Sequence, residues 1–212
     1  MYKLFHRYAR KVSTIIIAVL FSISLWQLAT AGWIQGKAIV AQQLLNSSWN
    51  RTLINPGKFD SKNKKSSGQK AINNKPWPWA DTWPVAKLIV PQHDIEQIVL
   101  AGDSGSSLAF GPGHSLESAA PNTRGTTMIS GHRDTHFEFI DDVEVNDAIY
   151  LQTADKTTRY QVYDLRIVDS KTYTVQPDTG EQTLVLTTCY PFDAVSSGGS
   201  LRYLVFANKQ DI

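Results

Sequence analysis

Three polar residues, Cys189, His132 and Arg202, have the side-chain types that covalent acyl transfer requires. A cysteine acyltransferase or hydrolase needs a thiolate, a proton donor for the leaving amine and a group that stabilises the oxyanion. An imidazole exchanges protons near neutral pH, which suits His132 to general acid and base catalysis. A guanidinium keeps its charge, so Arg202 can bind substrate or stabilise negative charge but cannot shuttle a proton.

The expected secondary structure places each of the three residues at the end of a strand. In sequence order, strand 126–130 precedes His132, strand 183–188 precedes Cys189, and Arg202 precedes strand 203–207. If the last two strands pair antiparallel through the loop 190–201, the end of one and the start of the next lie at the same sheet edge. We therefore expect Cys189 and Arg202 to be neighbours, beside a loop that is too long for a tight hairpin turn.

From Pro84 onward the sequence is typical of β structure. Short runs rich in β-branched and aromatic residues are bounded by turn residues, and they lie at 85–90, 95–100, 126–130, 148–152, 158–168, 183–188 and 203–207. Seven or eight strands in about 125 residues favour an all-β fold, either a closed barrel or a sandwich. Residues 115–120 and 137–143 are expected to form short helical turns.

The N-terminal part has the pattern of a membrane anchor. No charged residue occurs between Val12 and Gly36, a stretch long enough at about 1.5 Å per residue to cross about 30 Å of hydrocarbon. Four basic residues precede it, which places the N-terminus in the cytoplasm. We expect a cytoplasmic segment at 1–11 and a transmembrane signal anchor at 12–36 in the cell (inner) membrane, with an extracytoplasmic, periplasmic domain after it. Cleavage after the small residues at 29–31 stays an alternative.

Composition sets the remaining boundaries. Residues 37–80 are expected to form a membrane-proximal helix and a flexible basic linker, rich in Asn, Lys, Ser and Gly, and 81–212 a catalytic domain. Up to residue 80 there are 12 Lys and Arg against one acid, and beyond it 9 against 18, which gives charges of +11 and −9. The acidic domain argues against a nucleic-acid partner.

Cys189 is the only cysteine in the sequence. An unpaired thiol outside the cytoplasm is a liability unless it has a function, which favours a functional role for Cys189.

Short motifs around the three residues resemble those of sortases, a family of cysteine transpeptidases. Segment 183–189 (TLVLTTC) resembles the sortase strand that ends in the nucleophile, 130–134 (SGHRD) resembles the histidine segment, and 201–207 (LRYLVFA) resembles the arginine strand. The order His, Cys, Arg and the intervals of 57 and 13 positions fit that family. Segment 110–114 (FGPGH) is similar to a turn found ahead of the histidine. Each motif is short, and their joint occurrence is the specific signal.

The resemblance implies an eight-stranded sortase-like β-barrel that catalyses ping-pong transpeptidation. Cys189 would attack an LPxTG-like C-terminal sorting signal, His132 would protonate the departing amine, and Arg202 would bind substrate and stabilise the oxyanion. Thr188 and Tyr190 flank the nucleophile and are candidate substrate-binding or oxyanion-binding positions. The partners implied are a protein with the sorting signal, an amine acceptor and the lipid bilayer. No cofactor or metal is expected, and the compact sequence is similar to sortases of Gram-negative bacteria.

Other titratable residues have a structural interpretation beside a catalytic one. His114, in a Gly-Pro-Gly setting, is either a turn residue or a second base. His136 follows His132 by four positions, a spacing that metal ligands use on a helix. Asp134 either pairs with Arg133 or orients the imidazole. A cluster of acids forms either a solvated face or a calcium site; its members are Glu138, Asp141, Asp142 and Glu144.

Two alternative functions fit the same sequence. An exported cysteine peptidase would use the same residues and hydrolyse without transfer, and a peptide-binding β-barrel adaptor would hold an extended peptide without cutting it. Replacing Cys189 with Ala separates an enzyme from an adaptor, because only the enzyme would lose its function. In each case we expect the loops 101–122 and 190–201 to set the specificity of the binding groove.

Overall fold

The computed structural model describes residues 2–54, 74–177, 180–194 and 198–210; within the N-terminal helix it describes side chains from residue 16 onward, except at 31, 34, 35 and 38. The chain divides into two compact units, Met1–Gln43 and Leu44–Ile212. Most of the predicted flexible linker, residues 55–73, lies outside the described residues.

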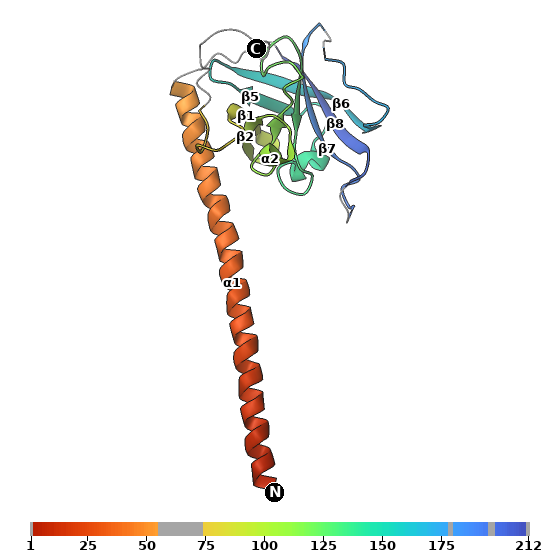
Figure 1. The fold of residues 1–212 in the computed structure, drawn as a ribbon. Helices are drawn as coiled ribbons and strands as arrows, with labels where there is room; N and C mark the ends of the chain where they lie inside the picture. The colour runs from red at the N-terminus through yellow and green to blue at the C-terminus, as the bar shows by residue number, and fades with distance from the viewer. Residues whose placement is uncertain (1, 55–73, 178–179, 195–197, 211–212) are drawn as a thin grey trace. The chain divides into compact units, whose positions relative to one another are not determined.

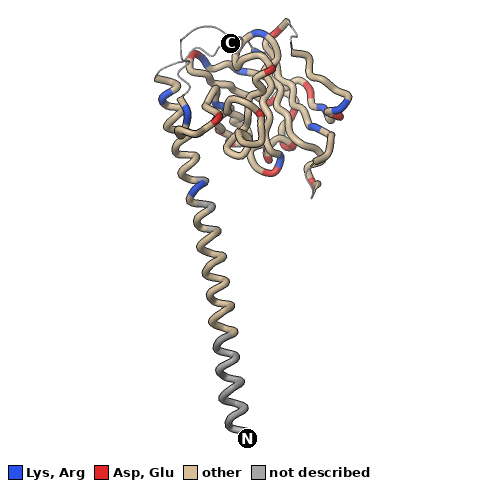
Figure 2. The backbone as a smooth tube through the Cα atoms, viewed as in Figure 1, with Lys and Arg blue, Asp and Glu red and all other residues tan. Residues whose placement is uncertain are grey.

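Helix α1 (Tyr2–Ile54) is one continuous helix of 53 residues (Figure 1). The hydroxyls of Ser22 and Ser24 donate to carbonyls four residues earlier, at 2.8 and 3.0 Å, which satisfies these polar groups within the helix. The described part of α1 carries Lys and Arg but no Asp or Glu (Figure 2). Among the described residues, no helix combines the length and apolar character needed to cross a bilayer. The predicted transmembrane segment at 12–36 includes residues whose side chains are not described, and it stays a prediction.

The last turns of α1 belong to the second unit. Leu45, Ser48 and Trp49 are buried, each at most 4% exposed. The Ser48 hydroxyl donates to the carbonyl of Asn74, and the Asn74 side-chain amide donates to the Thr52 hydroxyl at 3.2 Å. A helical segment is thus an integral part of the unit that contains the strands.

The strands form a closed eight-stranded barrel (Figure 1). In chain order they are β1 (Pro84–Val90), β2 (Ile95–Ala101), β3 (Gly113–His114), β4 (Gly125–Ser130), β5 (Ala148–Gln152), β6 (Thr157–Asp169), β7 (Gln182–Cys189) and β8 (Leu201–Lys209). Around the barrel the order is β1-β2-β3-β4-β7-β8-β6-β5. The pairs β2–β3 and β4–β7 are parallel, and the other pairs are antiparallel. The expected barrel is confirmed, and closure leaves no free sheet edge.

Among the described residues, three short helices lie in the connections between strands: η1 (Pro91–His93), α2 (Gly105–Leu108) and η2 (Glu138–Asp142). The helical turn expected at 137–143 is confirmed by η2. The one expected at 115–120 is wrong, because this segment forms only turns and the helix lies earlier, at α2. Strand β3 was not expected, since two residues show no alternation of polar and apolar side chains.

Alternation along the strands divides their side chains between the barrel interior and the outer face. Leu184, Leu186 and Val205 are fully buried in the interior core. Val185 and Leu204, from the same two strands, form a second cluster with Phe206. Val168 of β6 and Tyr173 and Val175 of the β6–β7 connection pack against it. Burial of each such side chain contributes about 1.5–3 kcal/mol relative to exposure. The β6–β7 connection is therefore held against the outside of β7 and β8.

Candidate active site

The pairing of β4 with β7 sets the position of His132 relative to Cys189. The two strands are parallel, and Ser130 pairs with Thr187, 57 positions later. His132 and Cys189 are also 57 positions apart, so each lies two residues beyond this last pair. The ladder continues past the end of β4, because the N–H of Gly131 donates to the carbonyl of Thr187 at 3.1 Å. At a strand spacing of about 4.8 Å, the register brings the backbones of His132 and Cys189 side by side.

On the other side of β7, Cys189 pairs with Arg202 of β8 in an antiparallel ladder. The N–H of Tyr190 donates to the carbonyl of Leu201 at 3.1 Å, so the backbone hydrogen bonds flank the Cys189–Arg202 pair. In such a pair the Cα atoms are about 4.5 Å apart and the side chains lie on the same face. The prediction that Cys189 and Arg202 are neighbours is confirmed. The β4–β7 register extends this pair to a row of three residues, with His132 in the loop just after β4.

The row is open to solvent. The Cys189 thiol is exposed, His132 is exposed, and Arg202 is partly buried. Nη1 of Arg202 donates to the carbonyls of Gly199 and Leu201, at 2.7 and 2.8 Å. In this structure the guanidinium therefore holds the C-terminal end of the β7–β8 loop.

The loop that carries His132 is supported by close packing and one buried hydrogen bond. A Cβ atom at Gly131 would lie 2.6 Å from the Phe137 ring, so a glycine is needed for the ring to pack there. The N–H of Phe137 donates to the carbonyl of His132 at 2.9 Å. Thr188, which is 3% exposed, donates from its hydroxyl to the carbonyl of Gly131 at 2.8 Å. Thr188, just before Cys189, thus holds the backbone just before His132.

Tyr190 lies in an aromatic cluster at the start of the β7–β8 loop. Its ring stacks on Tyr203 with centroids 6.5 Å apart, and Phe192 meets both rings edge-on at 5.4 and 5.0 Å. Phe192 and Tyr203 pack against the interior core, and burial raises the pKa of Tyr203. The contacts of Thr188 and Tyr190 are with neighbouring protein segments, and their roles toward substrate or oxyanion stay predictions.

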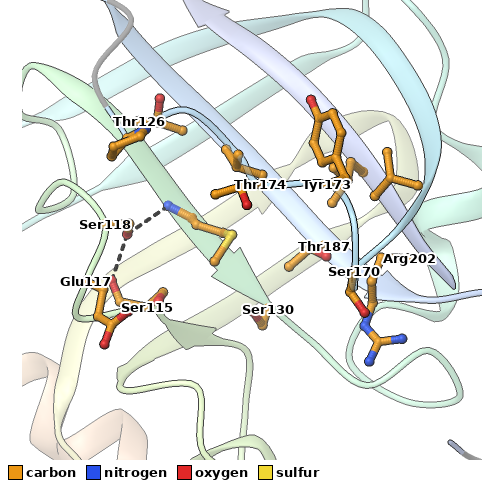
Figure 3. A pocket seen from close by; sticks show the side chains of 15 residues that line it. Ser115, Glu117, Ser118, Thr126, Ser130, Ser170, Tyr173, Thr174, Thr187 and Arg202 are labelled. Atoms are coloured by element: carbon orange, nitrogen blue, oxygen red, sulfur yellow. Dashed lines mark hydrogen bonds between the residues drawn. The ribbon is translucent and has the colours of Figure 1, made fainter. Parts of the chain in front are cut away.

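A groove of about 530 Å³ adjoins the row (Figure 3). The strands contribute outer-face residues to its lining, namely Thr126, Met128, Ser130, Val168, Thr187, Arg202 and Leu204; segments 115–118 and 170–177 contribute the rest. Figure 3 shows Arg202 at one end and Glu117 toward the other. Thr187 precedes Cys189 by two positions on the same face of β7. Of the three residues in the row, Arg202 lines the groove itself.

Comparison with known proteins identifies the family. The family model of the Sortase domain matches residues 88–210, more than half of the chain. The chain belongs to the sortase family. Sortase D of Bacillus subtilis (strain 168) is 30% identical over 123 residues, which make up 58% of this chain and 62% of that relative. The match thus spans less than two thirds of the relative's length.

Solved sortase structures share the fold. A Clostridium perfringens Sortase D5 transpeptidase superimposes with a TM-score of 0.61 at 20% identity, covering 81% of this chain and 99% of that chain. Sortase A from Corynebacterium diphtheriae gives a TM-score of 0.57 at 25% identity, covering 81% and 85%. The predicted family and the sortase-like barrel are confirmed, while the Gram-negative subtype stays a prediction.

In this sortase the carboxylate of Asp134 is held by the neighbouring Arg133. Nε and Nη2 of Arg133 donate to its two oxygens at 2.6 and 2.9 Å. The hydrogen bond from Arg133 holds the pKa of Asp134 below its usual range, with smaller contributions from the charges of Arg133 and His132. Of the two interpretations of Asp134, the structure supports the pairing with Arg133.

The other candidate residues lie in structural settings. His114 is fully buried, with Nε2 2.9 Å from the Ala119 carbonyl, and burial lowers its pKa. Burial and, to a smaller extent, the charge of His132 lower the pKa of the half-buried His136. Within the described part of the chain, no group of three or more His, Cys, Asp and Glu side chains is placed to hold a metal ion.

Sequence reasoning missed one wall of the groove. It pointed to the loops 101–122 and 190–201, and the lining does include 115–118. The other wall comes from the β6–β7 connection, through residues such as Ser170, Tyr173 and Pro177. The apolar residues inside that connection, such as Tyr173 and Val175, could have indicated that it packs against the barrel. Residues 195–197 of the 190–201 loop lie outside the described residues.

Proposed function

We propose that this sortase is a transpeptidase that cleaves an LPxTG-like C-terminal sorting signal and transfers its acyl part to an amine. The row of His132, Cys189 and Arg202 beside the groove carries this proposal. Cysteine acyl transfer needs a nucleophile, a proton donor and a cation within reach of one substrate carbonyl. Three neighbouring strands, each about 4.8 Å from the next, supply that spacing.

In the first half-reaction the Cys189 thiolate attacks the carbonyl carbon of the Thr–Gly-type bond. The C–S bond forms, the C–N bond breaks, and the imidazolium of His132 gives its proton to the departing amine. Arg202 stabilises the oxyanion of the tetrahedral intermediate. To do so, its guanidinium exchanges hydrogen bonds to Gly199 and Leu201 for bonds to the substrate. The product is a thioester acyl-enzyme.

In the second half-reaction an amine acceptor resolves the thioester. His132, now neutral, takes a proton from the attacking amine while the new C–N bond forms. The C–S bond then breaks and returns Cys189 as a thiolate. No redox change occurs, and the same imidazole serves as acid in one step and base in the other.

The groove suits an extended peptide. Its lining mixes hydroxyl groups, such as those of Ser130 and Thr187, with apolar side chains such as Met128 and Leu204. Hydroxyls can hydrogen-bond the backbone of a bound peptide, and apolar surface can bury its side chains. A volume of about 530 Å³ lies within the usual range for ligand sites, about 300–1,000 Å³.

The decisive experiment is intact-mass analysis of the full-length protein incubated with an LPxTG-type peptide, with and without diglycine as the amine. We expect an acyl adduct on the wild type that diglycine converts into an amine-linked product, and no adduct on Cys189→Ala. An adduct lost only to water would instead indicate a hydrolase. No adduct with any of a panel of sorting peptides would contradict the proposal and favour a peptide-binding role.

Attachment to a bilayer is a separate proposal that rests on the sequence. The uncharged stretch between Val12 and Gly36 follows four basic residues, which favours insertion with the barrel on the extracytoplasmic side. Alkaline carbonate washing of membranes from expressing cells tests it. The full chain should stay in the membrane pellet and a variant lacking 1–36 should not; release of the full chain would contradict the proposal.

A further inference from the structure

We propose that Arg133 is a positioning residue that ties the loop carrying His132 to the loop following Cys189, and so fixes the imidazole relative to the thiol. The inference rests on the acyl-transfer function proposed above. Arg133 follows the histidine directly in the sequence. It is distinct from Arg202, which lies across β7 from it.

The guanidinium of Arg133 reaches the segment just after the nucleophile. Nη1 donates to the carbonyl of Pro191, two residues beyond Cys189, and Nη2 donates to the carbonyl of Ala194 at 2.8 Å. One side chain thus connects the backbone next to the proposed acid and base with the backbone next to the proposed nucleophile. A shift of either loop would lengthen these hydrogen bonds.

Asp134 keeps the arginine in this position. It accepts from Nε at 2.6 Å and from Nη2 at 2.9 Å, so all three guanidinium nitrogens have acceptors. The Arg133 side chain is only 11% exposed, whereas that of Asp134 is 69% exposed. A largely buried cation needs such pairing to offset its desolvation. The planar fork serves acceptors in several directions, which a lysine ammonium on a flexible stem does not reproduce.

The hydrogen bonds from β7 to the histidine loop reach Gly131, one residue before His132. Thr188 and Thr187 both bond the backbone of Gly131. Beyond Gly131, Arg133 makes the hydrogen bonds that join the described residues of the two loops. The hydrogen bond from Asp134 raises the pKa of Arg133, and the charge of Cys189 adds to it, which agrees with a guanidinium near the thiol.

The two arginines hold opposite ends of the β7–β8 loop. Arg133 binds carbonyls at 191 and 194, and Arg202 binds carbonyls at 199 and 201. Arg202 lines the groove and exchanges its loop contacts for substrate in the proposed reaction. Arg133 is paired with Asp134 and keeps its hold on the loop throughout.

The test measures single-turnover acylation of the full-length protein by an LPxTG-type peptide, for Arg133→Gln and Arg133→Lys. The matched control is Arg166→Gln, because Arg166 on β6 forms a similar pair with Asp164 at 2.5 Å. We expect Arg133→Gln to lower the maximal acylation rate about 10- to 100-fold, with the peptide concentration at half-maximal rate within about twofold of wild type. Arg133→Lys should recover part of the rate, and Arg166→Gln should match wild type.

A purely structural role for Arg133 would overturn the inference, and the same data reveal it. It is overturned if Arg133→Gln acylates at the wild-type maximal rate, if only the half-saturating concentration changes, or if the control loses as much rate. If Arg133→Gln does not fold, Arg133→Lys decides: a wild-type rate overturns the proposal, and a reduced rate with an unchanged Tm supports it. A wild type that forms no acyl-enzyme overturns the proposed function itself, which separates the two failures.

Discussion

Cys189 lies between two strands that hold their functional residues in different ways. On the β8 side, Arg202 is placed by an antiparallel ladder whose backbone hydrogen bonds flank the pair. On the β4 side, the strand ends at Ser130, and His132 lies beyond it in a loop. That loop is placed by side-chain contacts, namely the packing of Phe137 on Gly131 and the bond from Thr188.

This difference predicts which part of the site tolerates substitutions of nearby side chains and which part does not. Backbone pairing depends little on individual side chains, so the spacing of Cys189 and Arg202 should survive most substitutions nearby. The spacing of Cys189 and His132 should depend on a few buried contacts, because a displacement of about 1 Å can cost about 100-fold in rate. Changes on the β4 side should therefore reduce catalysis without removing the thiol.

The largest effect expected is that of His132→Ala, which removes the proposed acid and base. Positioned proton transfer contributes about 10²–10⁴-fold to rate, so acylation by a sorting peptide should fall by that amount. Stopped-flow or quenched mass analysis measures it. Reaction of Cys189 with iodoacetamide should persist in the variant, since the thiol stays exposed; an unchanged acylation rate would show that another residue moves the proton.

Gly131→Ala tests the packing under the histidine loop. The added Cβ would lie 2.6 Å from the Phe137 ring, so the ring or the loop must move. We expect acylation to fall about 10- to 100-fold and stability to fall by about 1–3 kcal/mol. Peptide kinetics and urea unfolding measure the two effects.

Gly105→Ala is the matched control, because a Cβ there meets nothing within 4 Å. It should behave as wild type in both assays. Equal kinetics for the two alanine variants would contradict the importance of this close approach.

Thr188→Val removes one hydroxyl and keeps the shape of the side chain. The buried carbonyl of Gly131 loses a 2.8 Å hydrogen bond, which should cost about 1–3 kcal/mol of stability. We expect a several-fold loss of acylation rate, smaller than for Gly131→Ala. Thr172→Val serves as control, because Thr172 is exposed and its bond to Asp169 is 3.4 Å long; parallel losses in the two variants would refute the supporting role of Thr188.

The smallest effect on catalysis is expected for Tyr160 of β6, which contacts Gln182 at the start of β7. Tyr160 is fully buried, accepts from Gln182 at 2.8 Å and donates to Asn122 at 3.2 Å. Burial raises its pKa from 10.0 to about 12, so the fold disfavours the ionised form. Stability should be intact below about pH 10 and should decline as the pH rises toward 12.

Tyr160→Phe should remove that part of the alkaline decline and leave the acylation rate near neutral pH unchanged. Urea unfolding at a series of pH values, beside the peptide assay, checks both statements. An identical alkaline decline in the variant, or a loss of acylation, would contradict this separation of barrel stability from the site.

The sequence alone could predict part of the arrangement around Cys189. Cys189 and Arg202 were predictable as neighbours because a single loop joins consecutive strands. The place of His132 was not, because β4 and β7 are parallel partners separated in the chain by β5 and β6. Strand β3 has two residues and no periodicity, and the groove wall at 168–177 depends on tertiary packing of Tyr173 and Val175. The histidine motif and the family resemblance identified the residue, and the ladder register explains its position.

The central claim, a row of His132, Cys189 and Arg202 across three strands, can be tested with disulfides. The chain contains no other cysteine, so His132→Cys and Arg202→Cys each create one new possible bridge to Cys189. Neighbouring strands place Cα atoms within the 4.4–6.8 Å that disulfides require. Thr172→Cys, on the β6–β7 connection, serves as control.

The measurement is intact mass under denaturing conditions after mild oxidation in a glutathione buffer. We expect His132→Cys and Arg202→Cys each to lose two hydrogen atoms and become resistant to alkylation, while Thr172→Cys keeps two alkylatable thiols. A bridge in Arg202→Cys but not in His132→Cys would contradict the placement of the histidine, and with it the proposed site.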